Sequence, residues 1–260
     1  MLNNQITHFI SNNPLVQYLL QLGDTALVLS HRNSEWCGHG PILEQDIALT
    51  NIALDQVGQA RNFYQYAATI IQEQTNENIT EDDLAFLRDS WDFKNTLIAE
   101  LPNGDWAQTI LRNFFISTYQ YYLYQDLSKS TDEQLKAICS KAFKEVSYHM
   151  RWSADWVIRL GDGTEESHQK MDNAIDALWN YSTELVVPTN YEISNLNDSQ
   201  QAISIDWYKK VSGVLHEAKI KIPEDSFMQE GGKKGIHTEH LGFVLAEMQF
   251  LQRAYPGLTW

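Results

Sequence analysis

The chain has 260 residues, 43% of them hydrophobic and 20% charged, so it can bury a sizeable core and is not expected to be disordered. Its 19 Lys and Arg against 34 Asp and Glu leave a formal net charge of −15, which repels phosphate backbones and argues against a nucleic-acid partner. The 2 cysteines are too few for a disulfide framework or for a four-cysteine zinc or iron–sulfur site.

The first residues, 1–13, carry neither the basic and apolar regions of a secretory signal nor the pattern of an Arg-rich transit peptide. The longest apolar stretch runs from Leu15 to Leu29 and is interrupted by Gln17, Gln21 and Asp24. It is shorter than the roughly 20 apolar residues that span a bilayer. We therefore expect a cytoplasmic protein with no membrane partner.

Long proline-free intervals with apolar residues three and four positions apart predict a mostly helical chain, with strands at most peripheral. The predicted helices, in chain order, are 14–34, 41–73, 82–99, 105–128, 132–160, 164–186, 202–219 and 238–253. The longer polar stretches are interpreted as surface excursions of one domain rather than as linkers. We expect a single domain over 1–260, with core helices at about 14–34, 41–73, 105–128 and 132–160 and a C-terminal extension at about 187–260.

The interval 41–73 predicts a helix close to 50 Å long at about 1.5 Å per residue. It is apolar on more than one side, and a single narrow, mostly polar seam runs along it. We expect this helix to be central and nearly all-round buried. Such a helix among other long helices predicts an all-α, ferritin-like four-helix bundle with additional peripheral helices. The seam consists of Glu44, Ala48, Asn51, Asp55, Gly58 and Asn62.

A di-iron site in such a bundle needs a Glu from each of two helices and a Glu-x-x-His from each of two others. Three acids occupy expected inward positions on three long helices: Asp24, Asp55 and Glu145. The two places for histidine, three residues further on, hold Gly58 and Tyr148 instead. Glycine offers no side-chain ligand and a neutral phenol is a poor one, so the set is predicted to be incomplete.

Two interpretations of these acids remain open. In the first they are surface carboxylates or members of a salt-bridge network with a neighbouring Arg or with His149. In the second Asp24, Asp55, Glu145 and His149 hold a mononuclear or asymmetric metal centre, with Glu145 and His149, four residues apart, as its anchor. In that case the chain would itself be a metal-dependent oxidoreductase.

A glycine-rich segment, Gly231-Gly-Lys-Lys-Gly235, precedes the last predicted helix. It lacks the spacing of a Walker loop, so a nucleotide-hydrolysing site is not expected. Backbone amides and two ammonium groups favour either a solvated loop or a docking surface for an acidic partner or an anionic ligand.

Several separate segments, in order along the chain, resemble the C-subunit family of phenylacetyl-CoA epoxidases, also called phenylacetate-CoA oxygenases. The resemblance runs from roughly Tyr18 to Trp260. It rests on Glu35-Trp-Cys-Gly-His-Gly-Pro41, Asp46-Ile-Ala-Leu-Thr-Asn-Ile-Ala-Leu-Asp55, Glu145-Val-Ser-Tyr-His149, Gly231-Gly-Lys-Lys-Gly-Ile-His-Thr-Glu-His-Leu-Gly242 and Ala246-Glu-Met-Gln-Phe-Leu-Gln-Arg253.

The resemblance implies a ferritin-like, structural and non-catalytic subunit of a multicomponent monooxygenase in aerobic phenylacetate catabolism. That complex converts phenylacetyl-CoA to its ring 1,2-epoxide with O2 and NADPH. A related catalytic subunit holds the di-iron centre and pairs with the family member as a heterodimer that assembles further with other small subunits. A reductase with FAD and an iron–sulfur cluster delivers electrons, so the resemblance implies no cofactor in this chain.

The resemblance also implies substrate contacts. The segment from Arg88 to Asn95 is similar to the stretch that lies near the acyl-CoA in this family, which makes Asp92, Phe93, Lys94 and Asn95 the candidate substrate-binding residues. In the same way Asp24, Asp55, Gly58, Glu145, Tyr148 and His149 are interpreted as vestigial metal-site positions. A strongly acidic chain is a poor sole host for polyanionic CoA, so the catalytic partner is expected to supply most phosphate contacts.

Overall fold

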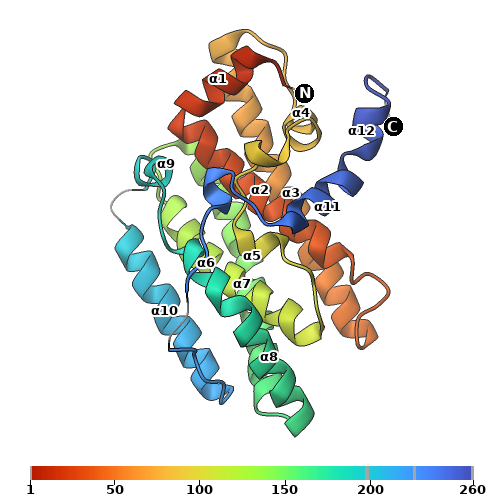
Figure 1. Cartoon of the computed structure of the whole chain (residues 1–260). Helices are drawn as coiled ribbons and strands as arrows, with labels where there is room; N and C mark the ends of the chain where they lie inside the picture. Colours follow the sequence, from red (N-terminus) through yellow and green to blue (C-terminus); the bar gives the residue numbers. More distant parts are fainter. Residues whose placement is uncertain (1, 197–198, 225–226, 259–260) are drawn as a thin grey trace.

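A computed structural model describes residues 2–196, 199–224 and 227–258. Within these ranges the chain forms α-helices and short 3₁₀ helices and contains no strand. The four longest helices are α2 (Pro14–Ser34), α3 (Leu43–Thr75), α6 (Trp106–Leu127) and α7 (Glu133–Gly161). Helix α2 packs along α3 and α6 packs along α7, while α3 and α7 also touch, which gives the all-α, ferritin-like bundle that the sequence predicted (Figure 1).

Local signals explain why the bundle helices begin and end where they do. Asn13 caps α2 by accepting a hydrogen bond from the backbone N–H of Val16, and Pro14 fits the first helical position. Asp132 caps α7 by accepting from two backbone N–H groups. Helix α3 ends at Asn76, whose positive φ of 59° is the left-handed conformation that stops a helix.

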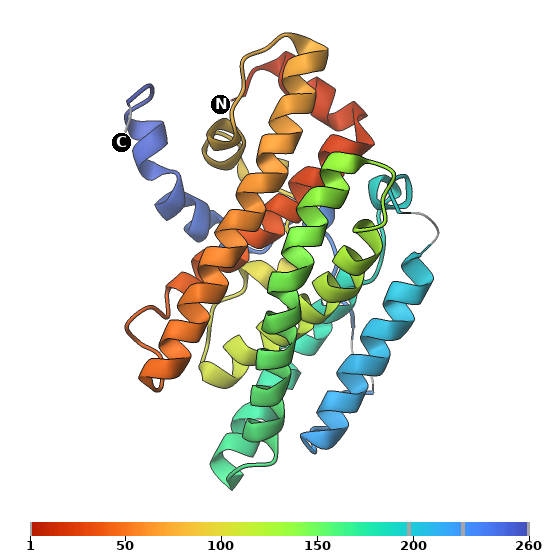
Figure 2. The same ribbon diagram turned by 180° about the vertical axis from the view of Figure 1, so that it is seen from behind.

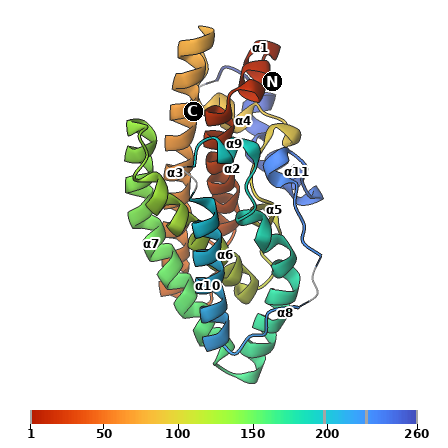
Figure 3. The same cartoon turned by 90° about the vertical axis from the view of Figure 1, so that its left-hand side faces the viewer.

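Shorter elements surround the bundle, and among the described residues no helix is long and apolar enough to cross a bilayer. Helix α10 lies along α6 and α7 (Figure 3), and α8 packs against α6. The remaining α-helices are α1 (Asn4–Asn12), α4 (Glu81–Phe86), α5 (Leu97–Glu100), α8 (Glu165–Ser182), α9 (Asn190–Ile193), α10 (Gln200–Glu217), α11 (Glu239–Met248) and α12 (Phe250–Ala254). The 3₁₀ helices are η1 (Ser90–Asp92), η2 (Thr183–Leu185) and η3 (Gly232–Lys234).

The predicted helix 82–99 is wrong, because the chain there forms α4, η1, an extended stretch and α5. In the extended stretch and at the start of α5, backbone N–H groups bond to distant side chains instead of to a preceding helical turn. The N–H of Lys94 donates to Asp24 at 2.7 Å and the N–H of Leu97 donates to Glu184 at 2.7 Å. Helix α1, which the sequence analysis did not predict, packs against α2 and α3.

Helix α3 is less buried than predicted. Its inner side is packed, but Leu43 is 72% exposed and Leu54 is 64% exposed. Ile47 and Val57 are exposed on the same side. Figure 2 shows α3 and α7 side by side at the front of the molecule, with no other element drawn over them. The expectation of a helix buried nearly all round is therefore corrected: one apolar face of α3 has no partner among the described residues of this chain.

Candidate functional site

Neutral amides link three helices inside the bundle. Asn33 on α2 donates from Nδ2 to Gln56 Oε1 on α3 and to Asn113 Oδ1 on α6, each at 2.9 Å. Asn113 donates back to Asn33 Oδ1 at 2.9 Å. All three side chains are buried. Amides carry both donors and acceptors, so they satisfy one another without any charge.

The inward face of α3 is shifted by one residue from the predicted one. Gln56 and Gln59 are three residues apart, share one side of the helix and are 2% and 1% exposed. The side chain of Asp55 is 40% exposed. Apolar residues line both sides of α3, so hydrophobicity alone misplaced the inner side of the helix.

The same shift applies on α7. Val146 and His149, three residues apart, are buried, whereas Tyr148 is 40% exposed. Glu145 is half-buried at the edge of the bundle, where its Oε2 accepts a hydrogen bond from Gln59 at 3.0 Å. The interpretation of Gly58 and Tyr148 as inward seats of a former metal site is therefore corrected, since the positions that face the interior are Gln59 and His149.

The donors present do not fit a di-iron centre. His149 Nε2 lies 2.9 Å from Asp55 Oδ2, and Nδ1 of the same ring is buried with no hydrogen-bond partner in the part of the chain that the structure describes. Glu145 bonds to an amide instead. In the described ranges no three His, Cys, Asp or Glu residues are grouped so that they could hold a metal ion.

Asp24 lies in a different place from Asp55 and Glu145. It is fully buried and forms a two-pronged ion pair with Arg88, whose Nη1 lies 3.1 Å from Oδ2 and whose Nη2 contacts Oδ1. Tyr64 donates its hydroxyl to Asp24 at 2.6 Å, and burial raises the pKa of this phenol, so it stays a donor. Tyr64 is nine residues beyond Asp55, about 13 Å further along α3. The four ligands of the alternative metal interpretation, Asp24, Asp55, Glu145 and His149, are therefore not brought together.

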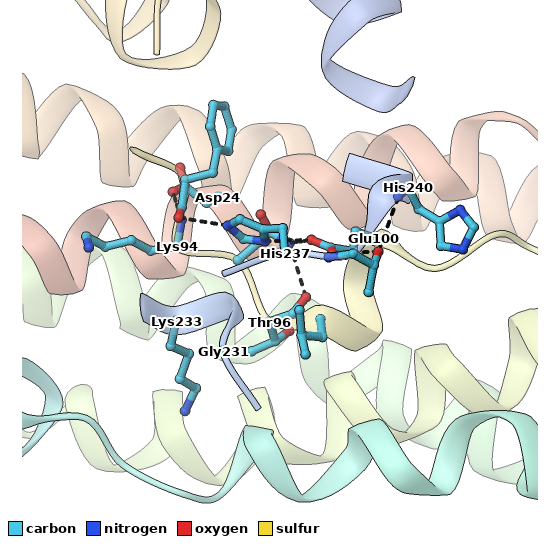
Figure 4. A network of polar contacts seen from close by, with 12 residues as sticks. Asp24, Lys94, Thr96, Glu100, Gly231, Lys233, His237 and His240 are labelled. Carbon is cyan, nitrogen blue, oxygen red and sulfur yellow. Dashed lines mark hydrogen bonds and ion pairs between the residues drawn. The ribbon is translucent and has the colours of Figure 1, made fainter. Parts of the chain in front are cut away.

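A second buried carboxylate, Glu100, holds the C-terminal segment (Figure 4). It accepts from Asn95 Nδ2 at 2.7 Å, from the Thr238 N–H at 2.6 Å and from His237 Nδ1 at 2.8 Å. His237 Nε2 also lies 3.0 Å from the carbonyl oxygen of Phe93. Both ring nitrogens thus face acceptors, which requires an imidazolium. Burial is the largest single influence and lowers the pKa of His237, but the hydrogen bond and charge of Glu100, the Phe93 carbonyl and the charge of Asp24 together outweigh it, so the net pKa is raised.

The segment Gly231–Gly235 is largely buried, so its interpretation as a solvated loop or docking surface is wrong. Glu184 accepts from the Gly231 N–H at 2.8 Å. Lys233 is 2% exposed and its Nζ bonds to Glu192 at 2.9 Å and to two backbone carbonyls at 3.1 Å. We call Asp24, Glu100, Glu184 and Glu192, with their partners Arg88, His237 and Lys233, the ionic layer.

The candidate substrate-binding residues divide into two pairs. Phe93 and Asn95 are fully buried. Asp92 and Lys94 line a cleft of about 210 Å³ together with Trp91 and residues of α1 and α2. Burial lowers the pKa of Lys94, whose Nζ lies 5.6 Å from the Tyr191 ring centroid. The cleft was not predicted from the sequence because one of its walls comes from α1, a helix that was not predicted either.

Two comparisons bear on this arrangement. The model of the family described as "Phenylacetic acid catabolic protein" matches residues 4–260. The C subunit of the 1,2-phenylacetyl-CoA epoxidase of Escherichia coli (strain K12) is 47% identical over 255 residues, which cover 95% of this chain and 100% of that protein. These findings agree with the resemblance inferred from the sequence segments.

Proposed function

Because this chain belongs to the phenylacetic acid catabolic protein family, we propose that it is a structural, non-catalytic subunit of a phenylacetyl-CoA epoxidase. In this role it stabilises a related di-iron subunit that performs the ring epoxidation with O2 and NADPH. The di-iron centre belongs to that partner, and FAD and the iron–sulfur cluster belong to a reductase. Other small subunits complete the complex.

The observation that carries this proposal is the neutral interior of the bundle. A di-iron centre of this fold needs carboxylates and imidazoles that project inward from four helices. Here Asn33, Gln56 and Asn113 project inward from three of the helices and are joined by hydrogen bonds, while α7 contributes the single imidazole of His149. Amide oxygens already engaged in this way cannot balance the charge of two iron ions, which favours a supporting rather than an oxidising role.

The cleft beside Lys94 supports a share in the acyl-CoA site. Lys94 forms no ion pair among the described residues, and its ammonium lies 5.6 Å from the Tyr191 ring centroid, so no carboxylate neutralises it; Trp91 is 69% exposed on the same cleft. Phe93 and Asn95 are buried behind the residues that line this cleft, so they would support its wall. The Phe93 ring lies 4.3 Å from Arg88 Cζ, and Asn95 bonds to Glu100. With a net charge of −15, this chain would leave most CoA phosphate contacts to the partner.

The test is elemental analysis for iron, manganese and zinc on the chain expressed alone and then co-expressed with the catalytic subunit. The proposal expects negligible metal in the chain alone and iron that arrives in step with the partner. A stoichiometric amount of iron in the chain alone would contradict it. In that case Glu145 and His149 would be the first residues to replace, with metal content and oxidation of phenylacetyl-CoA as the readouts.

A further inference from the structure

The outer side of α3 carries an apolar seam, which we define as Leu43, Ile47, Leu54 and Val57. With Thr50 and Arg61 included, successive positions alternate steps of four and three residues. This is the heptad spacing of a helix that packs lengthwise against another helix. The apolar members are 72%, 51%, 64% and 44% exposed, so the helix that this pattern anticipates is missing from the described chain.

The seam is large enough to form the centre of a stable interface. With Ile42 and Tyr148, which are 52% and 40% exposed at its margins, it presents on the order of 500 Å² of apolar surface. A standard interface covers about 800 Å² per partner around such a centre. Long-lived interfaces are the more apolar kind, whereas brief electron-transfer contacts are small and wet. The seam therefore fits a permanent subunit better than a reductase.

Gly58, at the edge of the seam toward α7, leaves room for a close partner, as the equally open Gly213 does on α10. It lies inside α3, where glycine is a poorer helix former than alanine. A Cβ at this position would meet no neighbouring element within 4 Å among the described residues. The packing of the chain itself thus gives no reason for the missing side chain. A partner backbone that approaches closely would provide one.

The charged residues on the same face indicate which charges the partner surface carries. Glu44 and Asp46 flank the seam at its N-terminal end. On the neighbouring α7, Lys141, Lys144 and Arg151 lie at the surface, and none of them forms an ion pair among the described residues. A matching surface carries basic groups opposite the first set and carboxylates opposite the second. A second copy of this chain would also bring a net charge of −15 against −15, which opposes self-association.

We propose that the seam and the adjoining edge of α7 are the docking site for the di-iron subunit, through one of its helices with a heptad-spaced apolar stripe. This inference rests on the proposed function, since it names the surface by which the chain would support that subunit. The partner helix lies along α3 from Leu43 to Val57, about 20 Å, and passes closest at Gly58.

The first experiment measures the affinity of the full-length chain for the catalytic subunit. Ile47→Glu and Leu54→Glu each place a carboxylate in the seam, and we expect binding at least 100-fold weaker. Ile205→Glu is the matched control, because Ile205 is 58% exposed on α10 and lies outside the seam. This control is expected to bind within about twofold of the wild type, since surface changes outside an interface have little effect.

A second variant separates docking from folding. Gly58→Leu introduces a better helix former into open space, so the thermal midpoint of the isolated chain is expected to rise. The same side chain would block the close approach, so affinity for the catalytic subunit is expected to fall at least tenfold. Loss of binding together with a gain in stability is a combination that damage to the fold does not produce.

Three outcomes would overturn the inference. If the catalytic subunit binds wild type and seam variants equally, the docking site lies elsewhere and the proposed function still stands. If the seam variants lose only self-association, measured by sedimentation, the seam serves a second copy of this chain. If the wild-type chain does not bind the catalytic subunit at all, the inference and the proposed function both fail.

Discussion

The interior of the bundle and the ionic layer solve the problem of buried polar groups in opposite ways. Around Asn33 and Asn113 the buried groups are neutral amides that bond to one another. In the ionic layer the buried groups are carboxylates. Two of them, Asp24 and Glu100, each bind a cationic side chain and a backbone N–H donor.

The difference follows from the backbone. Inside the bundle the helices satisfy their own N–H groups, so side chains need only satisfy each other. In the segments 93–97 and 231–238 few such bonds are available, and Lys94, Leu97 and Gly231 donate their N–H groups to carboxylates. Charge is concentrated where the chain is irregular. The four carboxylates of the ionic layer therefore lie at junctions between segments that are far apart in the chain.

The largest expected effect breaks the ionic layer at its deepest pair. Arg88→Met leaves Asp24 buried without a cation, and we expect the free energy of unfolding to fall by about 3–5 kcal/mol in urea denaturation. The control is Arg61→Met, because Arg61 is 67% exposed in its pair with Glu81 and should matter by at most about 1 kcal/mol. If the free energy of unfolding falls equally in the two variants, the buried Arg88–Asp24 pair contributes no more than the exposed Arg61–Glu81 pair, and the prediction fails.

A double variant sharpens the same point. Asp24→Leu combined with Arg88→Met removes both charges, so part of the stability lost in the single variant should return. Recovery stays incomplete because the Tyr64 hydroxyl and the Lys94 N–H lose their acceptor.

The next effect depends on pH. Because the folded pKa of His237 is raised above 6.5, its protonation stabilises the fold fully below that pH, and the contribution disappears as pH rises through the folded pKa. His237→Gln should lower the free energy of unfolding by roughly 1.5–3 kcal/mol near pH 6 and by less near pH 9. The exposed His216→Gln variant is the control. A loss that is independent of pH would argue against an imidazolium bound to Glu100.

A steric change tests how tightly the C-terminal segment sits on the ionic layer. A Cβ on Gly232 would lie 2.3 Å from the carbonyl oxygen of Asn95, so Gly232→Ala should destabilise the chain by roughly 1–3 kcal/mol. Gly213→Ala on α10, where a Cβ meets nothing within 4 Å, should instead stabilise it by about 0.5–1 kcal/mol. Thermal unfolding of both variants checks the opposite signs.

The smallest effect belongs to the bundle. Asp55→Leu removes the partner of His149 Nε2, but the Asp55 side chain is 40% exposed and water can replace it. We expect a loss of about 1 kcal/mol or less and no change in metal content by elemental analysis. Loss of a bound metal in this variant would show that Asp55 is a metal ligand, and it would contradict a bundle interior filled by neutral amides.

Most of the bundle is predictable from the sequence because its signals are local. The cap at Asn13 and the proline after it mark the start of α2. The failure at 82–99 has a distant cause: acceptors on Asp24 and Glu184 lie 70 and 87 residues away from the N–H groups that they bind. No periodicity within the segment records these bonds.

The candidate site was harder to predict for a different reason. Along α3 the apolar residues form both an inner face and the outer seam, and hydrophobicity alone does not distinguish a core from an interface. The heptad steps from Leu43 to Val57 were the available signal, because a helix buried on all sides has no need of them. On α7 the metal-site spacing placed Glu145 and Tyr148 inside, whereas the structure buries Val146 and His149.

The position of the ionic layer in the chain has a consequence for synthesis on the ribosome. Asp24 can meet Arg88 early, but Glu192 and Glu100 wait for Lys233 and His237, which are 41 and 137 residues further along the chain. Until those residues have emerged, Glu100 and Glu192 lack the cations that neutralise them in the fold. Complete folding of the ionic layer therefore waits for the segment 231–238, and a chain that stops before residue 231 carries a built-in defect that quality-control proteases can recognise.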